Sequence, residues 1–138
     1  MKVHTTNYKD AFIQVADDSP AKAGEIPPVK GIEKSVANIQ FEMIGENPYK
    51  FTSDDVLFHT YAVKKGLEKD ELPAERENFF SKGQPCLRAS PLTKRYGWGV
   101  HSNAEGKVAL YSVDSDDYKK FSDDEKLEVV KAMRSKRA

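Results

Sequence analysis

The sequence has little of several things that usually reveal a protein's role. It contains a single cysteine, Cys86, so no internal disulfide can form. No apolar run approaches the eighteen or so residues of a membrane span, and the first residues lead directly into polar sequence without a signal-peptide core. We therefore expect a cytoplasmic protein that does not enter a membrane.

An excess of charge of one sign is also missing. Lys+Arg and Asp+Glu both number 22 among the 138 residues, which removes any global electrostatic reason to expect nucleic acid as a partner. Locally the charges separate, with five cations against Glu105 alone between Lys82 and Lys107. Seven acids against three lysines follow in residues 108–128. We expect a basic patch beside an acidic one on a neutral protein.

Signatures of metal, nucleotide and covalent chemistry do not occur. The three histidines lack metal-ligand spacing, and there is no phosphate loop, dinucleotide fingerprint or Gly-x-Ser-x-Gly elbow. Cys86 lies outside any recognisable catalytic signature, and a lone cysteine is usually a small buried apolar residue. We expect no metal and no cofactor, and the sequence leaves open whether the chain is an enzyme.

Short apolar and β-branched runs predict the strands. One is "DAFIQVA" (residues 10–16), and "YGWGVH" (96–101) and "KVALYSV" (107–113) form a hairpin around "SNAEG". Residues 125–138 fit either a strand or a helical stripe, and the pair "VV" within them favours the strand. The sequence therefore predicts an antiparallel sheet of about four strands.

Cap signals predict the helices, over residues 35–47 and 53–65, with shorter helices beginning near Pro73 and Ser115. Segregated strands and helices indicate an α+β fold, as a single compact domain over residues 1–138 with helices packed on one face of the sheet. The expected core includes Phe12, Val15, Val36, Ile39, Met43, Ile44, Leu57, Phe80, Val100, Leu110 and Val130.

A long irregular segment, Asp17 to Lys34, carries three prolines and two glycines. Loops of this length inside a small domain are uncommon, and they are often functional or act as clamps across a core. We expect a proline-stiffened strap that covers one end of the sheet.

The densest group of polar side chains is "RASPLTKRYGWGVH", residues 88–101. Ser90 and Pro91 start a short helix, and the hydroxyls and free amides of its first turn would form an anion site. A guanidinium just before the helix could fork onto a phosphate or carboxylate, cations at the helix end could steer it, and a histidine could converge from the next strand. The candidate ligand-binding residues are Arg88, Ser90, Thr93, Lys94, Arg95 and His101.

The same residues also fit a purely structural interpretation. Lys94 and Arg95 suit the negative end of the short helix, and Arg88 would then pair with an acid in residues 114–124. Trp98, between two glycines, fits either a core anchor or a ring that a ligand approaches closely.

Three functions are consistent with this stretch. The first is binding of a small anionic molecule bearing a phosphate or carboxylate. The alternative is an interaction module that holds nucleic acid or an acidic protein with this surface and the basic tail. The third is a small enzyme that uses His101 with Tyr96 or Arg88. A monomer and a homodimer are both compatible with the sequence.

The wording of several segments carries a resemblance over nearly the whole chain: "TTNYKDAFIQVADD", "GEIPPVKG", "SVANIQFEMI", "NPYKFTSDDVLF", "FFSKGQPCLRASPLTKRYGWGVHSNAEGKVALYSV" and "VVKAMRSKR". Together they resemble a family of small uncharacterised bacterial proteins, classed only as a domain of unknown function. The resemblance implies a compact bacterial cytosolic protein of one domain. It implies no activity, substrate or site residues.

Overall fold

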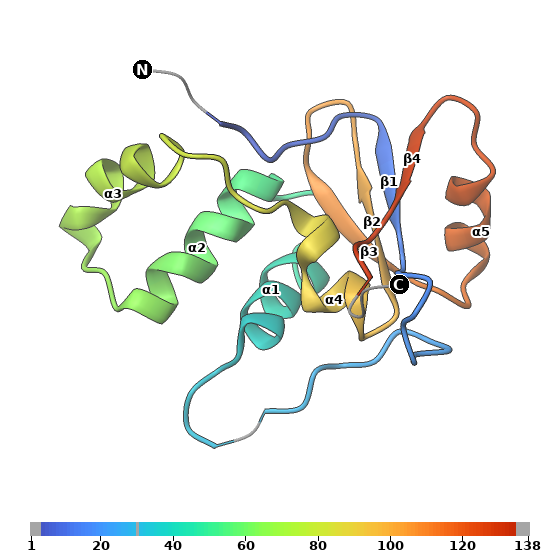
Figure 1. Cartoon of the computed structure of the whole chain (residues 1–138), viewed down its shortest axis with the longest axis horizontal. Helices are drawn as coiled ribbons and strands as arrows, with labels where there is room; N and C mark the ends of the chain where they lie inside the picture. The colour runs from blue at the N-terminus through green and yellow to red at the C-terminus, as the bar shows by residue number, and fades with distance from the viewer. Residues whose placement is uncertain (1–3, 30, 135–138) are drawn as a thin grey trace.

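The computed structural model describes residues 4–29 and 31–134 and has an α+β fold (Figure 1). The predicted class, with a four-stranded sheet, is confirmed. The strands are β1 (Ala11–Gln14), β2 (Trp98–Ser102), β3 (Val108–Ser112) and β4 (Glu128–Lys131). The helices are α1 (Val36–Gly45), α2 (Ser53–Lys65), α3 (Leu72–Phe79), α4 (Pro91–Lys94) and α5 (Asp116–Ser122), with 3-10 turns η1 (Lys69–Glu71) and η2 (Leu87–Ala89).

The strand order of the sheet is β3-β2-β1-β4. The pairs β1–β2 and β2–β3 are antiparallel, whereas β4 runs parallel to β1, so the sheet is mixed where the sequence predicted only antiparallel pairing. Because β3 and β4 run in the same direction at opposite edges, the chain between them crosses the sheet, and α5 lies in that crossover. The ambiguous C-terminal segment is a strand over Glu128–Lys131, as the sequence favoured.

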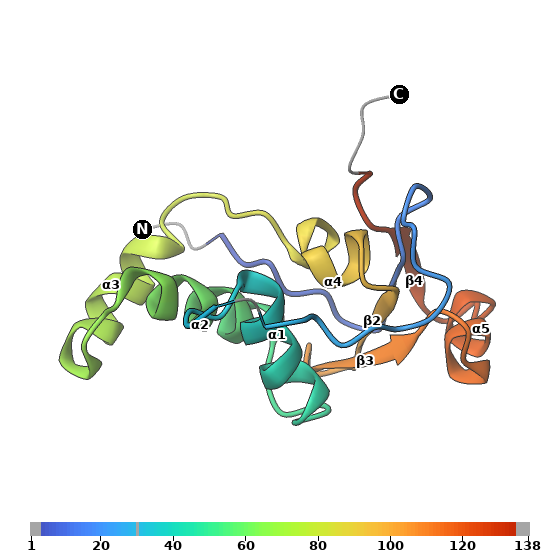
Figure 2. The ribbon, with the colours of Figure 1, turned by 90° about the horizontal axis from the view of Figure 1, so that it is seen from below.

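Side chains alternate between the two faces of the sheet, so neighbouring residues of one strand have different surroundings. Ile13 and Val100 enter the main core with residues of α1, α2 and α4. Phe12 lies on the other face, against Tyr118 and Phe121 of α5. The two long helices therefore share one face as expected, while the short α5 covers the opposite face (Figures 1 and 2).

Most of the expected core residues are buried, including Phe12, Ile39 and Val100. Met43, Leu57, Leu110 and Val130 are partly buried against the main core. Val36 is 37% exposed and was wrongly assigned to the core. It is the first residue of α1, where it lines surface hollows beside Pro91.

Caps set the ends of the two long helices as the sequence indicated. Ser35 caps α1 in a reciprocal capping box with Asn38, and Thr52 does the same for α2 with Asp55. Gly66 ends α2 at a φ of 71°, the left-handed conformation that glycine adopts without steric cost. The connection through η1 then brings α3 back beside α2.

The long proline-rich segment is a strap, as expected, and hydrogen bonds hold it across the end of the hairpin. The amide of Glu25 donates to the carbonyl of Tyr96 at 2.8 Å, and the indole of Trp98 donates to the carbonyl of Glu25 at 2.8 Å. The side-chain amide of Asn38 donates to the carbonyl of Pro27 at 2.9 Å, which ties the strap to α1.

We expect Gly97→Ala to lower the free energy of unfolding by at least about 2 kcal/mol, from left-handed strain and overpacking together. Gly97 has a φ of 79°, and an added Cβ would clash with the carbonyl group of Ala23 in the strap, 2.9 Å from its carbon. Gly83→Ala is the control, since its Cβ would meet no atom within 4 Å. Urea denaturation of both variants measures the difference, and equal stabilities would contradict this account of the strap.

Candidate functional site

The two hydroxyls expected to bind an anion lie inside the protein. Ser90 Oγ accepts from the amide of Leu92 at 3.1 Å, as predicted for a helix cap, and donates to Oε1 of Gln40 at 2.6 Å. Thr93 is fully buried, and its hydroxyl lies 2.8 Å from the carbonyl oxygen of Leu87. Both side chains are buried, and their hydroxyls already bond to protein atoms.

Arg88 holds the C-terminal strand in place. Its Nε donates to the carbonyl of Lys131 at 2.6 Å, and its own carbonyl accepts from the amide of Met133 at 2.8 Å. The structural interpretation had expected an acidic partner in residues 114–124, and the partner is instead a backbone carbonyl. Arg88 thus joins η2 to the end of β4.

His101 does not converge with Arg88 and Ser90, because it lies on the opposite face of the sheet. Its ring stacks on Phe121 with centroids 4.2 Å apart, and its Nδ1 is 2.8 Å from the hydroxyl of Tyr49. That hydroxyl also lies 2.7 Å from the hydroxyl of Tyr111. The structure does not bring His101 together with Arg88 or Tyr96, because His101 lies on the α5 side of the sheet, whereas Tyr96 packs against the main core on the other side.

The remaining candidates, Lys94 and Arg95, lie at the surface. With the first turn of α1 and Tyr96 they line a shallow hollow of about 310 Å³. Within the part of the chain that the structure describes, neither cation belongs to an ion pair. Of the six predicted ligand residues, the structure brings only these two together at an accessible surface.

Trp98 is a half-buried packing residue. Its ring contacts Gly24 of the strap and packs against Phe41 of α1 at 5.5 Å between centroids. The question left open by its two flanking glycines is resolved in favour of packing, because the strap and α1 cover the indole.

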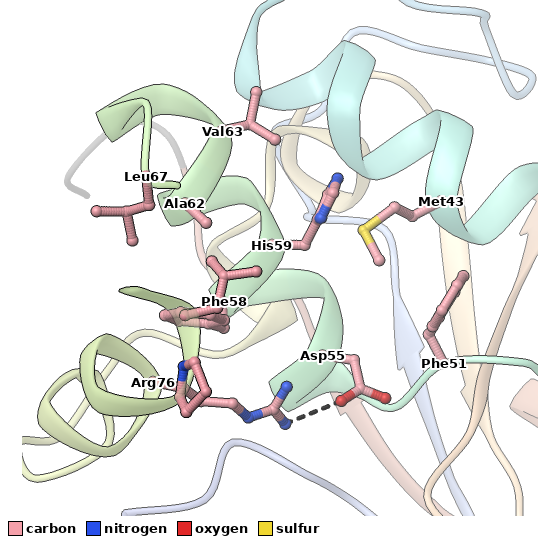
Figure 3. Close-up of a pocket in the computed structure, with 11 residues that line it drawn as sticks. Met43, Phe51, Asp55, Phe58, His59, Ala62, Val63, Leu67 and Arg76 are labelled. Carbon is pink, nitrogen blue, oxygen red and sulfur yellow. Dashed lines mark hydrogen bonds and ion pairs between the residues drawn. The ribbon is translucent and has the colours of Figure 1, made fainter. Parts of the chain in front are cut away.

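A larger hollow lies elsewhere, in a groove of about 630 Å³ along α2 (Figure 3). One side of α2 forms the floor, because residues 55, 58, 59, 62 and 63 recur at helical spacing. Met43 and Phe51 form one wall, and Leu67, Leu72, Pro73 and Arg76 form the other. We call this hollow the α2 groove.

Apart from Arg76, the walls of the α2 groove are apolar, and the ion pair of Arg76 with Asp55 lies near the start of α2. Arg76 Nη2 donates to Asp55 Oδ1 at 2.8 Å, and Asp55 Oδ2 accepts from the amide of Thr52 at 3.1 Å. The guanidinium lies 5.7 Å and 5.6 Å from the ring centroids of Phe58 and Phe80. These contacts hold Arg76 in one orientation at the edge of the groove.

Asp55 is charged at neutral pH. Burial alone would raise the pKa of its carboxyl, but the amide of Thr52 and the guanidinium of Arg76 hold that pKa below its usual value. His59, one turn further along α2, is exposed in the groove. The groove therefore offers a fixed anion, a fixed cation and an imidazole beside an apolar surface.

The sequence predicted a helix over residues 53–65 but not this groove, and it placed Leu57 of that helix in the core. The signal that could have revealed the groove is a second apolar stripe along the helix, formed by Phe58, Ala62 and Val63. It lies beside the first stripe, in which Val56 and Thr60 are buried. Two apolar stripes on one helix indicate a second partner, and α3 covers the second stripe only in part.

The described ranges 4–29 and 31–134 contain no group of three or more His, Cys, Asp or Glu side chains that could hold a metal ion. Their helices are too short and too polar for any of them to cross a membrane.

The model of a family described as "Family of unknown function (DUF6157)" matches residues 3–138. No curated protein and no solved structure matches the chain.

We expect the protein to lose stability as the pH falls below about 6.5, in part through His101. Burial lowers the pKa of His101, although Asp10 and Asp124 oppose this. The unfolded chain therefore takes up this proton first, so the contribution of His101 is present above pH 6.5 and declines from there toward the folded-state pKa.

Urea denaturation between pH 5 and pH 7.5 measures this effect, with His101→Gln for comparison. The variant should lose less stability on acidification than the unmodified protein. An NMR titration should give a pKa below 6.5 for the His101 imidazole of the folded protein. Parallel pH profiles for the two proteins would contradict the assignment.

Proposed function

We propose that this chain, which belongs to the DUF6157 family of unknown function, is a binding protein for a small molecule with an apolar body. The observation that carries the proposal is the α2 groove, a hollow of about 630 Å³ whose walls are apolar apart from Arg76, with the ion pair of Arg76 and Asp55 near one end. Small-molecule sites typically measure roughly 300–1,000 Å³ and combine such walls with a few well-placed polar groups.

The exposure of the lining side chains supports this function. Val63 is 47% exposed and Met43, Leu67 and Leu72 are half-buried, so apolar surface faces solvent along the groove. Covering this surface with an apolar ligand removes it from water, which is favourable in proportion to the area.

The wall formed by α3 can adjust to a ligand. No residue of α3 is fully buried, and its C-terminal Phe79 packs on Phe58 and Tyr61 with centroids 5.7 Å and 4.8 Å apart. Elements with few buried contacts are the ones that open at low free-energy cost. The groove thus has a rigid floor in α2 and a more yielding wall in α3, apart from Arg76, which Asp55 and the rings of Phe58 and Phe80 hold in place.

We expect Val63→Glu to weaken the binding of N-phenyl-1-naphthylamine, an apolar fluorescent probe, by at least about tenfold, because a ligand would bury the new charge. Val29→Glu is the matched control: Val29 is an exposed valine of the strap, outside the groove. Fluorescence titration of the three proteins tests the proposal. It fails if the unmodified protein gives no saturable signal, or if both variants lose binding equally.

A second candidate function is binding of a small anionic molecule in the hollow at Lys94 and Arg95, which keeps the ligand class expected from the sequence. The specific observation in its favour is the pair of cations lining one hollow, with no acidic partner in the described residues. The same surface would suit an acidic protein or nucleic acid.

Thermal shift tests this second candidate with inorganic phosphate as the probe. We expect phosphate to raise the melting temperature of the unmodified protein and of Lys82→Gln, an exposed-cation control, but not of the double variant Lys94→Gln/Arg95→Gln. Equal shifts in all three proteins, or none, would rule out a phosphate site here. Binding of a single-stranded oligonucleotide that falls steeply with salt would instead favour nucleic acid.

We also propose that the protein comes from a bacterium and acts in the cytoplasm. The support is the resemblance in sequence and the single cysteine, which cannot form an internal disulfide.

A further inference from the structure

The fixed ion pair at the edge of the α2 groove indicates what kind of polar head its ligand carries. We infer that the groove selects a neutral carboxamide head on an apolar chain, in preference to a carboxylate of the same length. This inference rests on the proposed function, because it concerns the ligand of the same groove.

The first step is the hydrogen-bonding capacity that the pair leaves free. Within the described residues, Asp55 is the only hydrogen-bond partner of the Arg76 guanidinium, which donates to it through Nη2. A guanidinium has five N–H donors in one plane, so several remain for a ligand. Asp55 Oδ1 accepts this one bond, and a carboxylate oxygen has a second lone pair available. The pair therefore presents a donor and an acceptor side by side.

A primary amide matches this arrangement. Its carbonyl can accept from Arg76 while its NH₂ group donates to Asp55, which forms two hydrogen bonds to ionised partners.

A carboxylate fits the pair less well. It gains the same contact with Arg76, but it has no N–H for Asp55 and places a second negative charge beside it. The pKa of Asp55 is held below its usual value, so this carboxyl stays ionised at neutral pH and repels the carboxylate of the ligand. The attraction of one cation is thus offset by the repulsion of one anion. A neutral head meets no such opposition.

The position of the guanidinium strengthens this discrimination. Arg76 lies near the rings of Phe58 and Phe80, which restricts its rotation away from Asp55 toward a competing anion. A side chain held in its binding orientation also loses little conformational freedom when the ligand arrives. Head-group selection therefore comes from a preformed pair.

The length of the groove sets the apolar part of the ligand. Asp55 and Val63, at the two ends of the floor, are eight residues apart on α2, which is about 12 Å at the helical rise. A straight alkyl chain of medium length spans this distance, and octanamide is a suitable probe. Leu67 lines the far end, beyond Val63.

The test compares octanamide, octanoate and octanol as competitors for bound N-phenyl-1-naphthylamine at pH 7.5. We expect octanamide to bind at least about tenfold more tightly than octanoate, with octanol between them. Asp55→Asn removes the charge and keeps an acceptor for the Thr52 amide. This variant should bind octanoate about tenfold more tightly than the unmodified protein does, so octanamide and octanoate should bind with nearly equal affinity.

The outcomes separate the two proposals. Tighter binding of octanoate than of octanamide by the unmodified protein overturns the head-group inference and leaves the groove as a binding site. If the probe binds but none of the three competitors displaces it, the head-group inference is likewise overturned and the groove remains a binding site. Failure of the probe to bind overturns both proposals. The ranking in the unmodified protein decides the matter even if Asp55→Asn does not fold, and its circular dichroism shows whether it does.

Discussion

The buried hydroxyls of Ser90 and Thr93 hold α1, η2 and α4 together. Ser90 bonds to Gln40 of α1 while it caps α4, and Thr93 contacts the carbonyl of Leu87 in η2. The carbonyl of Thr93 accepts from the amide of Ala16 just after β1. Buried polar groups stay stable only when each has a partner, so α1, η2, α4 and the end of β1 must keep their relative positions. The apolar core of Ile13, Val100 and Leu92 forms around this constraint.

The groove exists because α2 reaches beyond that core. Near its start, Asp54 is bound by the hydroxyls of Thr5 and Thr6 and by the amide of Thr6, which anchors α2 to the N-terminal segment. Further along, α2 packs with α3 in a separate small cluster of Phe58, Ala62 and Phe80. Two helices alone cannot enclose all their apolar surface, so part of α2 stays open between α1 and α3. The groove follows from this incomplete second layer.

Much of the fold could be predicted because its signals are local. Ser35, Thr52, Gly66 and Ser115 mark helix ends through bonds to nearby residues, and these assignments agree with the structure. The direction of β4 was not accessible, because its pairing with β1 depends on how α5 crosses the sheet. The candidate site failed for a related reason. Serine and threonine at a helix start suit a ligand and a buried network equally well, and only the position of Gln40, far along the chain, distinguishes the two.

The position of β1 has a consequence for how the chain is made. It is the first strand in the sequence, yet it lies inside the sheet, paired with β2 on one side and β4 on the other. Residue 11 meets residue 128, about 120 positions later, so the ribosome synthesises nearly the whole domain before β1 has both neighbours. Until then one edge of β1, within the apolar segment "AFIQVA", stays unpaired. The four-stranded sheet therefore closes only after β4 has been synthesised, late relative to the other elements of the described chain.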